Sequence, residues 1–149
     1  MTTFANRKTA IDALATIFAS TSAWQEIYKY FPSVNELLGK SPFLIMRARG
    51  SSNRMVGQNT NPRSYRVIVA SYVLAYSASD NWSSLNAEEK VHDLEVLFAQ
   101  TIRDNVANAA WDNIRFDEGY SDVTDMMIES LPYIREMFTV YIDLKKGSM

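Results

Sequence analysis

The residues best suited to metal binding or catalysis surround the only histidine of the sequence, His92. Glu88 precedes it by four residues and Glu95 follows it by three, so a helix would place the three side chains near one another. A specific metal site needs further converging ligands, but the chain has no second histidine and no cysteine. We therefore interpret this group as part of a solvated helix surface, while a metal-dependent enzyme using His92, Glu88 and Glu95 remains an alternative.

Sequence patterns that carry other common chemistry do not occur in the chain. It lacks the glycine-rich phosphate-binding patterns and the glycine-serine-glycine pattern of a serine nucleophile. We therefore predict no catalytic residue, no metal, no cofactor and no enzymatic activity.

Charge is distributed unevenly along the chain. Residues 37–79 contain no acidic residue but six basic ones, whereas the other 106 residues hold all 17 acids and nine of the 15 bases. The total charge of −2 is thus the sum of +6 in one segment and −8 in the rest. The six basic residues are Lys40, Arg47, Arg49, Arg54, Arg63 and Arg66. Such asymmetry predicts a surface that meets a negatively charged partner.

Four arginines of this segment are our candidate partner-binding residues: Arg47, Arg49, Arg54 and Arg63. They could bind acidic surfaces of a protein or the phosphates of a nucleic acid. A solvated loop is a third interpretation. The sequence pI of about 5.4 and the lack of an RNA-binding or helix-turn-helix motif favour a protein partner over nucleic acid.

A cluster of acids near the C-terminal end is the candidate counterpart of these arginines. It contains Asp112 and the four residues proposed as an acidic partner patch, Asp117, Glu118, Asp122 and Asp125. Its spacing does not match the calcium-binding loop of an EF-hand. It is either a solvated loop and strand edge or a patch that receives a basic partner, such as the arginine-rich loop of a neighbouring copy.

The pattern of apolar residues predicts the elements that position these side chains. Helices are expected over residues 6–20 and 86–108, with one helical turn at 34–38. Pro132 is expected to separate the last two strands. Strands are expected at 26–31, 43–48, 63–76, 123–129 and 133–144, with a short one at 113–116. The order α-β-β-β-α-β-β predicts one α+β domain over 1–149, with a mostly antiparallel sheet and two long helices on one face. A long flexible hairpin loop is expected at 49–63.

The strand at 63–76 is apolar on both faces, so both faces need cover. Two helices cover one face, which would leave Tyr72 and Tyr76 exposed on the other. We therefore expect these tyrosines to pack against a neighbouring subunit.

Composition limits the class of protein. The chain has 149 residues, of which 47% are hydrophobic and 21% charged, as in globular domains. No apolar run approaches the length of a membrane span, and the start lacks a secretory signal pattern. A product of the cytoplasm with no membrane partner is expected.

Several segments together resemble the tail terminator, or tail completion, proteins of long-tailed bacteriophages. The resemblance is carried by an amphipathic helix at 10–19 and by four later segments: EIYKYFPS at 26–33, SPFLIMRARG at 41–50, RSYRVIV at 63–69 and PYIREMFTVYIDL at 132–144. A long polar hairpin and a helix beginning NAEEKV at 86 complete the pattern.

The resemblance implies an α+β subunit of a ring, typically a hexamer, without catalysis or cofactor. Such a ring caps the tail tube, ends tail polymerisation and offers a surface to the head. The implied partners are further copies of the chain, the tail tube protein and a head-completion or neck protein, and the implied location is the virion, after synthesis in the host cytoplasm. The isolated subunit could be monomeric. A neck or head-completion adaptor and, with less support, a nucleic-acid-binding module are the alternatives.

Overall fold

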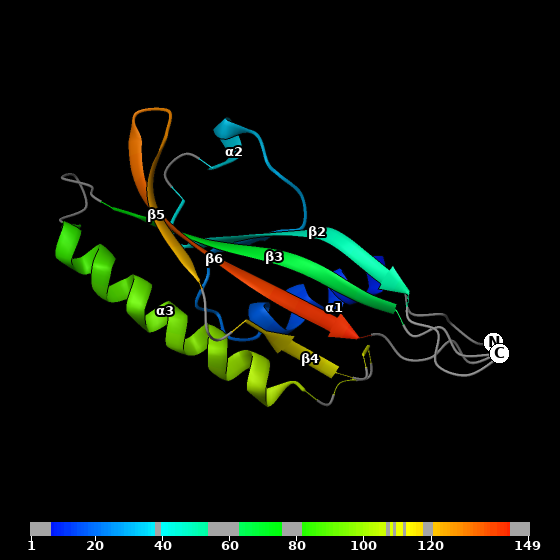
Figure 1. Ribbon diagram of the computed structural model, residues 1–149. Coiled ribbons are helices and arrows are strands. Elements are labelled where there is room, and N and C mark those ends of the chain that lie inside the picture. Colours follow the sequence, from blue (N-terminus) through cyan, green and yellow to red (C-terminus); the bar gives the residue numbers. More distant parts are fainter. Residues whose placement is uncertain are drawn as a thin grey trace, which may run out of the picture.

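A computed structural model describes residues 7–37, 40–53, 63–75, 82–106, 108, 110–111, 113–117 and 121–143. The α+β class is confirmed, since two longer helices and one short helix accompany a six-stranded mixed sheet in the described residues (Figure 1). The elements are α1 (Arg7–Ala19), β1 (Glu26–Tyr28), α2 (Val34–Leu37), β2 (Phe43–Asn53), β3 (Arg63–Leu74), α3 (Ser84–Asp104), β4 (Asn113–Phe116), β5 (Asp122–Ile128) and β6 (Leu131–Asp143).

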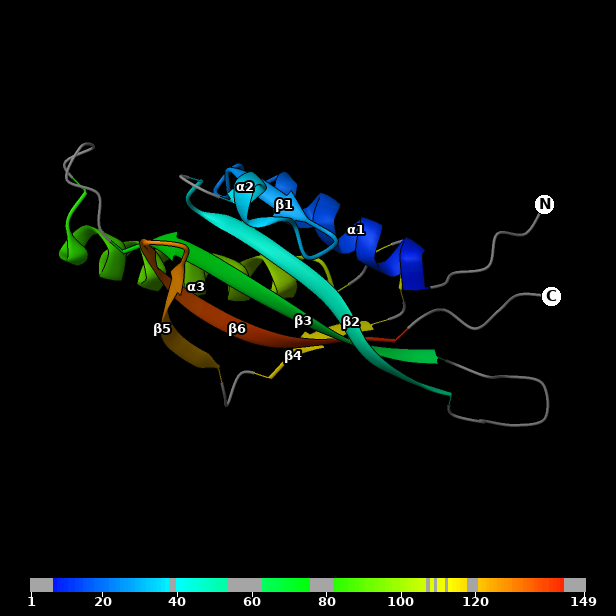
Figure 2. The same cartoon turned by 90° about the horizontal axis from the view of Figure 1, so that it is seen from above.

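The long strand β6 organises the sheet, whose order is β1-β2-β3-β6-β4 with β5 also paired to β6. One edge of β6 pairs with β3 along most of its length, and the other edge is divided between two strands. β5 takes residues 131–137 of that edge and β4 takes residues 140–143. All pairings are antiparallel except β1 with β2, which is parallel. The strands twist past one another along the sheet (Figure 2).

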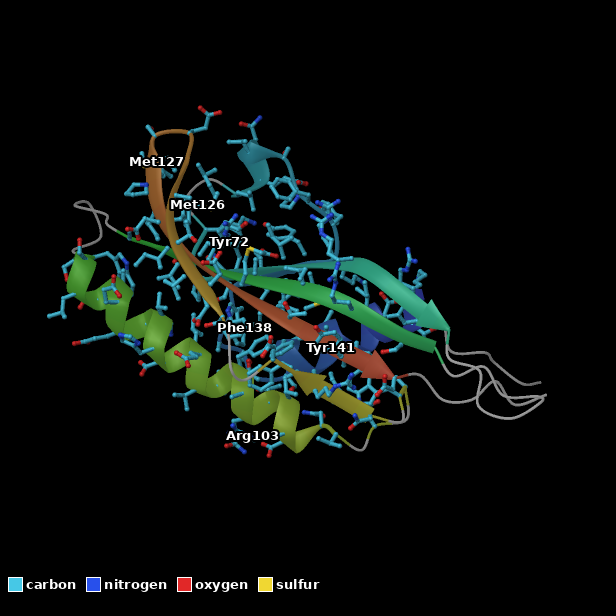
Figure 3. All side chains as sticks on the ribbon, in the orientation of Figure 1. Tyr72, Arg103, Met126, Met127, Phe138 and Tyr141 are labelled. Atoms are coloured by element: carbon cyan, nitrogen blue, oxygen red, sulfur yellow. The ribbon has the colours of Figure 1, made fainter. Side chains whose placement is uncertain are left out.

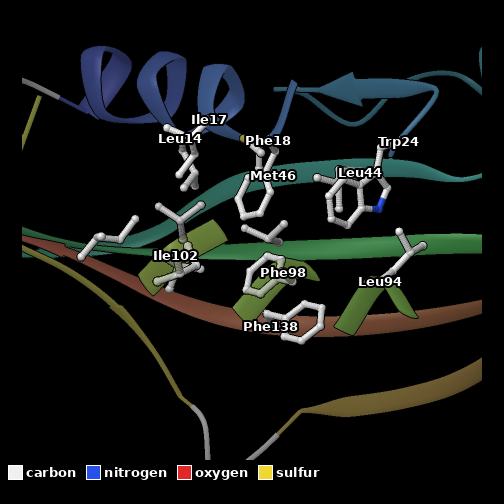
Figure 4. Close-up of a cluster of buried hydrophobic side chains, with 14 of the residues drawn as sticks. Leu14, Ile17, Phe18, Trp24, Leu44, Met46, Leu94, Phe98, Ile102 and Phe138 are labelled. Atoms are coloured by element: carbon white, nitrogen blue, oxygen red, sulfur yellow. The ribbon is translucent and has the colours of Figure 1, made fainter. Parts of the chain in front are cut away.

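One side of the sheet, the helix face, packs against α1 and α3. Alternate residues of β3, such as Val67 and Val69, point to this side because side chains alternate along a strand. Phe98 of α3 stands at the centre of the core, stacked on Phe18 of α1 with ring centroids 4.9 Å apart and on Phe138 of β6 at 3.9 Å (Figure 4). This aromatic column ties both helices to the sheet.

The opposite side, the far face, is covered over only part of its length by the elements that the structure describes. A second apolar cluster lies there, formed by Tyr28, Leu37, Phe43, Ile45, Ala70, Tyr72, Leu74, Ile128 and Tyr133. Leu37 comes from α2 and Ile128 from the β5–β6 hairpin, so these two elements cover this half of the face.

The expectation that Tyr72 needs a neighbouring subunit as cover is wrong. Tyr72 is only 4% exposed, and its ring stacks on Phe43 at a centroid distance of 4.7 Å. The one-turn helix α2 and the hairpin return over the sheet, which strand alternation alone does not reveal. Tyr76 lies outside the described residues.

Several predicted boundaries also differ from the structure: β1 ends at Tyr28 rather than at residue 31, and α3 covers Ser84–Asp104 rather than 86–108. β2 continues to Asn53, which pairs with Arg63, so residues 49–53 are strand rather than loop. The ladder accommodates them through a register shift between Ala48 and Gly50, and residues 54–62 lie outside the described residues.

Pro132 does not separate the last strands but lies inside β6. The chain reverses before it, at Glu129 and Ser130, where Glu129 has a positive φ of 55°. Proline is tolerated at this early strand position, where its carbonyl accepts a hydrogen bond from the Ala75 amide at 2.9 Å.

Candidate functional site

The half of the far face that no described element covers carries arginines from three strands. Arg66 of β3 lies opposite Tyr141 of β6, and Tyr141 lies opposite Arg115 of β4, so an aromatic ring stands between two arginines. In the neighbouring row, Arg47 of β2 lies opposite Ile68. We call this surface the arginine face; it comprises Arg47, Arg66, Arg115, Ile68, Thr139 and Tyr141. Figure 3 shows Tyr141 on β6, well along the sheet from Tyr72.

Aromatic rings hold two of these guanidinium groups. The Arg115 Cζ atom lies 5.0 Å from the centroid of the Tyr141 ring, and its Nη1 atom is 2.9 Å from Asp143 Oδ2. The Arg47 Cζ atom lies 5.9 Å from the centroid of the Phe31 ring, which is 62% exposed. Such contacts orient an arginine while leaving its N–H groups able to donate.

Arg47 and Arg66 have no acidic partner in the described part of the chain. Both side chains are exposed, and no salt bridge of the described residues includes either one. Arg66 Nη2 donates instead to the Arg49 carbonyl at 3.2 Å. In the described structure, these arginines lack acidic neighbours because residues 37–79 contain no acid. This segment supplies the two paired strands β2 and β3, so their arginines come together without carboxylates beside them.

The four arginines proposed from the sequence have different positions. Arg47 lies on the arginine face, and Arg49 is exposed at the register shift next to it. Arg63 begins β3, although its side chain is outside the described part, as is all of Arg54.

Sequence reasoning did not assign Arg66, Arg115 and Tyr141 to the site. The last two lie about 50 to 75 residues later in the chain than Arg66, so only the pairing of β6 with β3 and β4 brings them together. Arg135 is also on the far face, beside Tyr72, and its Nε atom is buried without a hydrogen-bond partner in the described structure.

The proposed acidic patch does not form as one surface. Asp122 pairs with Met137 and Asp125 with Ile134, so the two carboxylates point to opposite sides of the sheet. Their spacing of three residues on a strand makes this unavoidable, because side chains alternate with a period of two. Asp117 is exposed after β4, and Glu118 is outside the described residues.

Exposed acids lie instead along both flanks of α3, where Glu89 and Asp93 line a cavity with Leu74 and Glu95 lines another with Phe116 and Phe138. This helix contains five acids and two bases, and the exposed acids include Glu88, Glu89, Asp93 and Glu95. We call these four residues together with Val96 the acidic helix surface. Since α3 packs on the helix face, the acidic helix surface and the arginine face lie on opposite sides of the sheet.

His92 is exposed on α3 together with Glu88 and Glu95, as expected for a solvated helix surface. Nowhere in the described residues do three or more histidines, aspartates or glutamates converge in an arrangement that could hold a metal ion. A cavity of about 520 Å³ beside the first half of α3 is lined by Trp82, Asn86, Glu89, Lys90 and Asp93 with Ser41, Pro42 and Leu74.

Glu136 is a buried carboxyl that the sequence pattern did not single out. It lies on the helix face of β6 and is 3% exposed, and its Oε2 atom accepts a hydrogen bond from Ser121 Oγ at 2.8 Å. Burial raises the pKa of Glu136 above its ordinary value; the bond from Ser121 lowers it and the charge of Glu95 raises it further. Its position between Ile134 and Phe138 in an otherwise apolar alternation was the available signal.

The raised pKa of Glu136 predicts how stability depends on pH. Between the ordinary carboxyl pKa and the raised one, the folded chain holds a proton that the unfolded chain has released, so stability falls as pH rises through this interval. Glu136→Gln cannot lose a proton and still accepts the bond from Ser121. We expect its thermal midpoint to decrease less than that of the wild type between about pH 4 and pH 8.

Thermal unfolding of both proteins across this range checks the expectation. Glu89→Gln, at an exposed position on α3 and not among the groups that shift the pKa of Glu136, is the matched control and should follow the wild type. Parallel pH profiles for the wild type and Glu136→Gln would contradict the assigned role of burial.

Comparison with known proteins adds no assignment: no protein-family model and no curated protein matches the sequence. In the described residues, no helix has both the length and the apolar character needed to span a membrane.

Proposed function

We propose that this chain is a structural subunit of a bacteriophage tail, which forms a ring on the tail tube, ends tube polymerisation and offers a surface to the head. The observation that carries the proposal is the arginine face, a set of cations on three paired strands in which Arg47 and Arg66 have no acidic partner among the described residues. The resemblance of the sequence to tail terminator proteins supplies the biological setting.

The arginine face suits docking on a preformed protein surface. Its side chains project from paired strands, so their backbone positions are fixed before a partner arrives and little ordering is needed on contact. Arginine presents N–H groups that match carboxylates in paired geometry. We therefore assign the arginine face to contacts with acidic protein surfaces, with Arg49 beside it as a further contributor.

Reversing charge on this face tests the proposal. We expect Arg47→Glu/Arg66→Glu to need at least about tenfold more protein than the wild type to stop tube growth, because two attractive contacts become repulsive. Tube length measured by electron microscopy at several protein concentrations gives the result.

The matched control is Lys8→Glu/Lys29→Glu, which makes the same change in net charge on exposed lysines that bridge Asp12. Each variant is first shown to melt like the wild type. Tube capping at wild-type concentrations by a folded Arg47→Glu/Arg66→Glu protein would overturn the assignment of this face. Capping of the head vertex rather than the tube by the wild type would favour a neck adaptor.

A second candidate function, binding of single-stranded nucleic acid, is favoured by one observation. Tyr141 stands between Arg66 and Arg115 on a part of the sheet that no described element covers, an arrangement in which a base could stack while arginines bind phosphates. Titration with a labelled single strand at two salt concentrations distinguishes this function, since phosphate contacts weaken steeply as salt rises.

A further inference from the structure

The arginine face and the acidic helix surface are complementary in charge and lie on opposite sides of the same subunit. Among the described residues, the first carries Arg47, Arg66, Arg115 and one carboxylate, that of Asp143, which forms a salt bridge with Arg115. The second carries Glu88, Glu89, Asp93 and Glu95, all exposed. When a positive surface meets a negative one, the attraction between the charges orients the two proteins and increases the rate at which they associate.

Each of the two surfaces also has an apolar centre. Val96, three residues after Asp93 on α3, is 70% exposed. On the arginine face, Ile68 is half-buried between Arg47 and Thr139, and Tyr141 lies in the next row. An apolar centre surrounded by charged groups is the usual composition of a protein–protein contact.

The layers of the sheet indicate why the docked element should be a helix. α2 and the β5–β6 hairpin cover the far face around Tyr72 and Tyr133, whereas no described element covers it at Ile68 and Thr139. α3 packs on the helix face along β3, β4 and β6 through its apolar stripe, which leaves Val96 and the neighbouring acids exposed (Figure 1). A second helix laid on the arginine face would complete a sheet covered on both sides.

From these observations we propose that the acidic helix surface of one copy docks on the arginine face of the next copy. The contact joins two different surfaces, so each copy keeps one of them free for a further neighbour. Repetition of a head-to-tail contact of this kind produces a closed ring or a filament. This inference rests on the proposed function, because the contact would join the subunits of the proposed ring.

The absence of cysteine from the sequence allows a direct test by cross-linking. Val96→Cys places a thiol at the centre of the acidic helix surface, and Thr139→Cys places one on the arginine face. The two full-length variants are mixed at low salt with a short bis-maleimide, and products are resolved by denaturing electrophoresis. We expect the mixture to form at least about tenfold more covalent dimer than either variant alone, since only the mixture presents both surfaces as thiols.

Matched controls separate the contact from random collision. Lys8→Cys, at an exposed site on α1, replaces Thr139→Cys in one mixture and should give only background dimer. Arg66→Glu added to the Thr139→Cys chain should reduce the cross-link to that background, as should salt at about 1 M, where charges are screened beyond about 3 Å. A chain carrying both cysteines should form a ladder of covalent oligomers.

Several results would overturn the inference. The first is that the Val96→Cys/Thr139→Cys mixture cross-links no more than the Lys8→Cys mixture. The second is that most dimers form between copies of one variant. The third is that the protein binds a single-stranded oligonucleotide tightly and in a salt-dependent way, and that Arg66→Glu abolishes this binding. The tube-capping assay is scored separately. A chain that caps tubes but shows no cross-link would refute this subunit contact while leaving the proposed function in place.

Discussion

Replacing Phe98 by alanine is expected to lower the free energy of unfolding by about 3–5 kcal/mol, which corresponds to a fall of about 10 °C in the melting temperature for a domain of this size. Phe98 of α3 is fully buried at the centre of the core, where this helix meets α1 and β6. Its ring stacks on Phe18 and Phe138 and meets Phe116 edge-on at 5.6 Å. Alanine would remove the contacts of all three rings and leave a cavity that a packed sheet cannot close.

Chemical and thermal unfolding of the purified variant measure this effect. Val96→Ala is the control, because Val96 lies two residues away on the same helix but is 70% exposed, so its truncation should change stability by less than about 0.5 kcal/mol. A loss below about 1 kcal/mol for Phe98→Ala would contradict the central place of this ring in the core.

The second large effect is expected at Tyr133, on the other side of the sheet. Tyr133 is fully buried, and its hydroxyl shares its single proton between the backbone carbonyls of Lys40 at 3.1 Å and Leu37 at 3.3 Å. These bonds attach the end of α2 and the following segment to β6. Tyr133→Ala should therefore cost about 3–5 kcal/mol of stability, since it removes a buried ring and leaves the carbonyls without this donor.

Tyr133→Phe separates the two contributions. It keeps the ring against Phe43 and removes only the hydroxyl, so a loss of about 1–3 kcal/mol is expected. Unfolding by denaturant measures both variants, and hydrogen exchange at Leu37 and Lys40 shows whether the covering segment opens first. Equal stability of Tyr133→Phe and the wild type would show that these hydrogen bonds contribute nothing net. Tyr141→Phe, at a half-buried position on the same strand, is the control.

The difference in burial explains why stability and docking can be tested separately. Phe98 and Tyr133 lie in the two apolar clusters, whereas Arg47 and Arg66 are exposed. Charge reversal at exposed arginines is expected to leave the core packing unchanged. Loss of tube capping without a change in melting temperature therefore identifies a binding defect.

The sequence predicted most elements because their patterns are local. The apolar stripe of α3 is visible as Val91, Leu94 and Phe98, and all three are buried in the structure. The alternation in β6 likewise assigned Phe138, Val140 and Ile142 to one side, and all three contribute to the core under the helices. Periodicity of 3.6 or 2 residues reports burial directly, so it needs no knowledge of the partner element.

Predictions failed where a distant segment decided the outcome. Tyr72 was expected to be exposed, but α2 and the β5–β6 hairpin fold over its face. The parallel pairing of β1 with β2 was also not foreseen, because it depends on the course of the chain through α2. The split of Asp122 and Asp125 is different, since local strand alternation alone puts residues three apart on opposite sides of β5.

For the candidate site, the sequence by itself determined that residues 37–79 contain basic residues but no acidic ones, and that the acidic residues lie elsewhere in the chain. Charge content is a property of composition and needs no fold. Only the tertiary structure decided which cations act together, since the strand pairings bring Arg66 and Arg115 to either side of Tyr141 and place α3 on the opposite side of the sheet. The physical reason is that a surface is assembled by long-range pairing, whereas sequence periodicity records only which side of its own element a residue occupies.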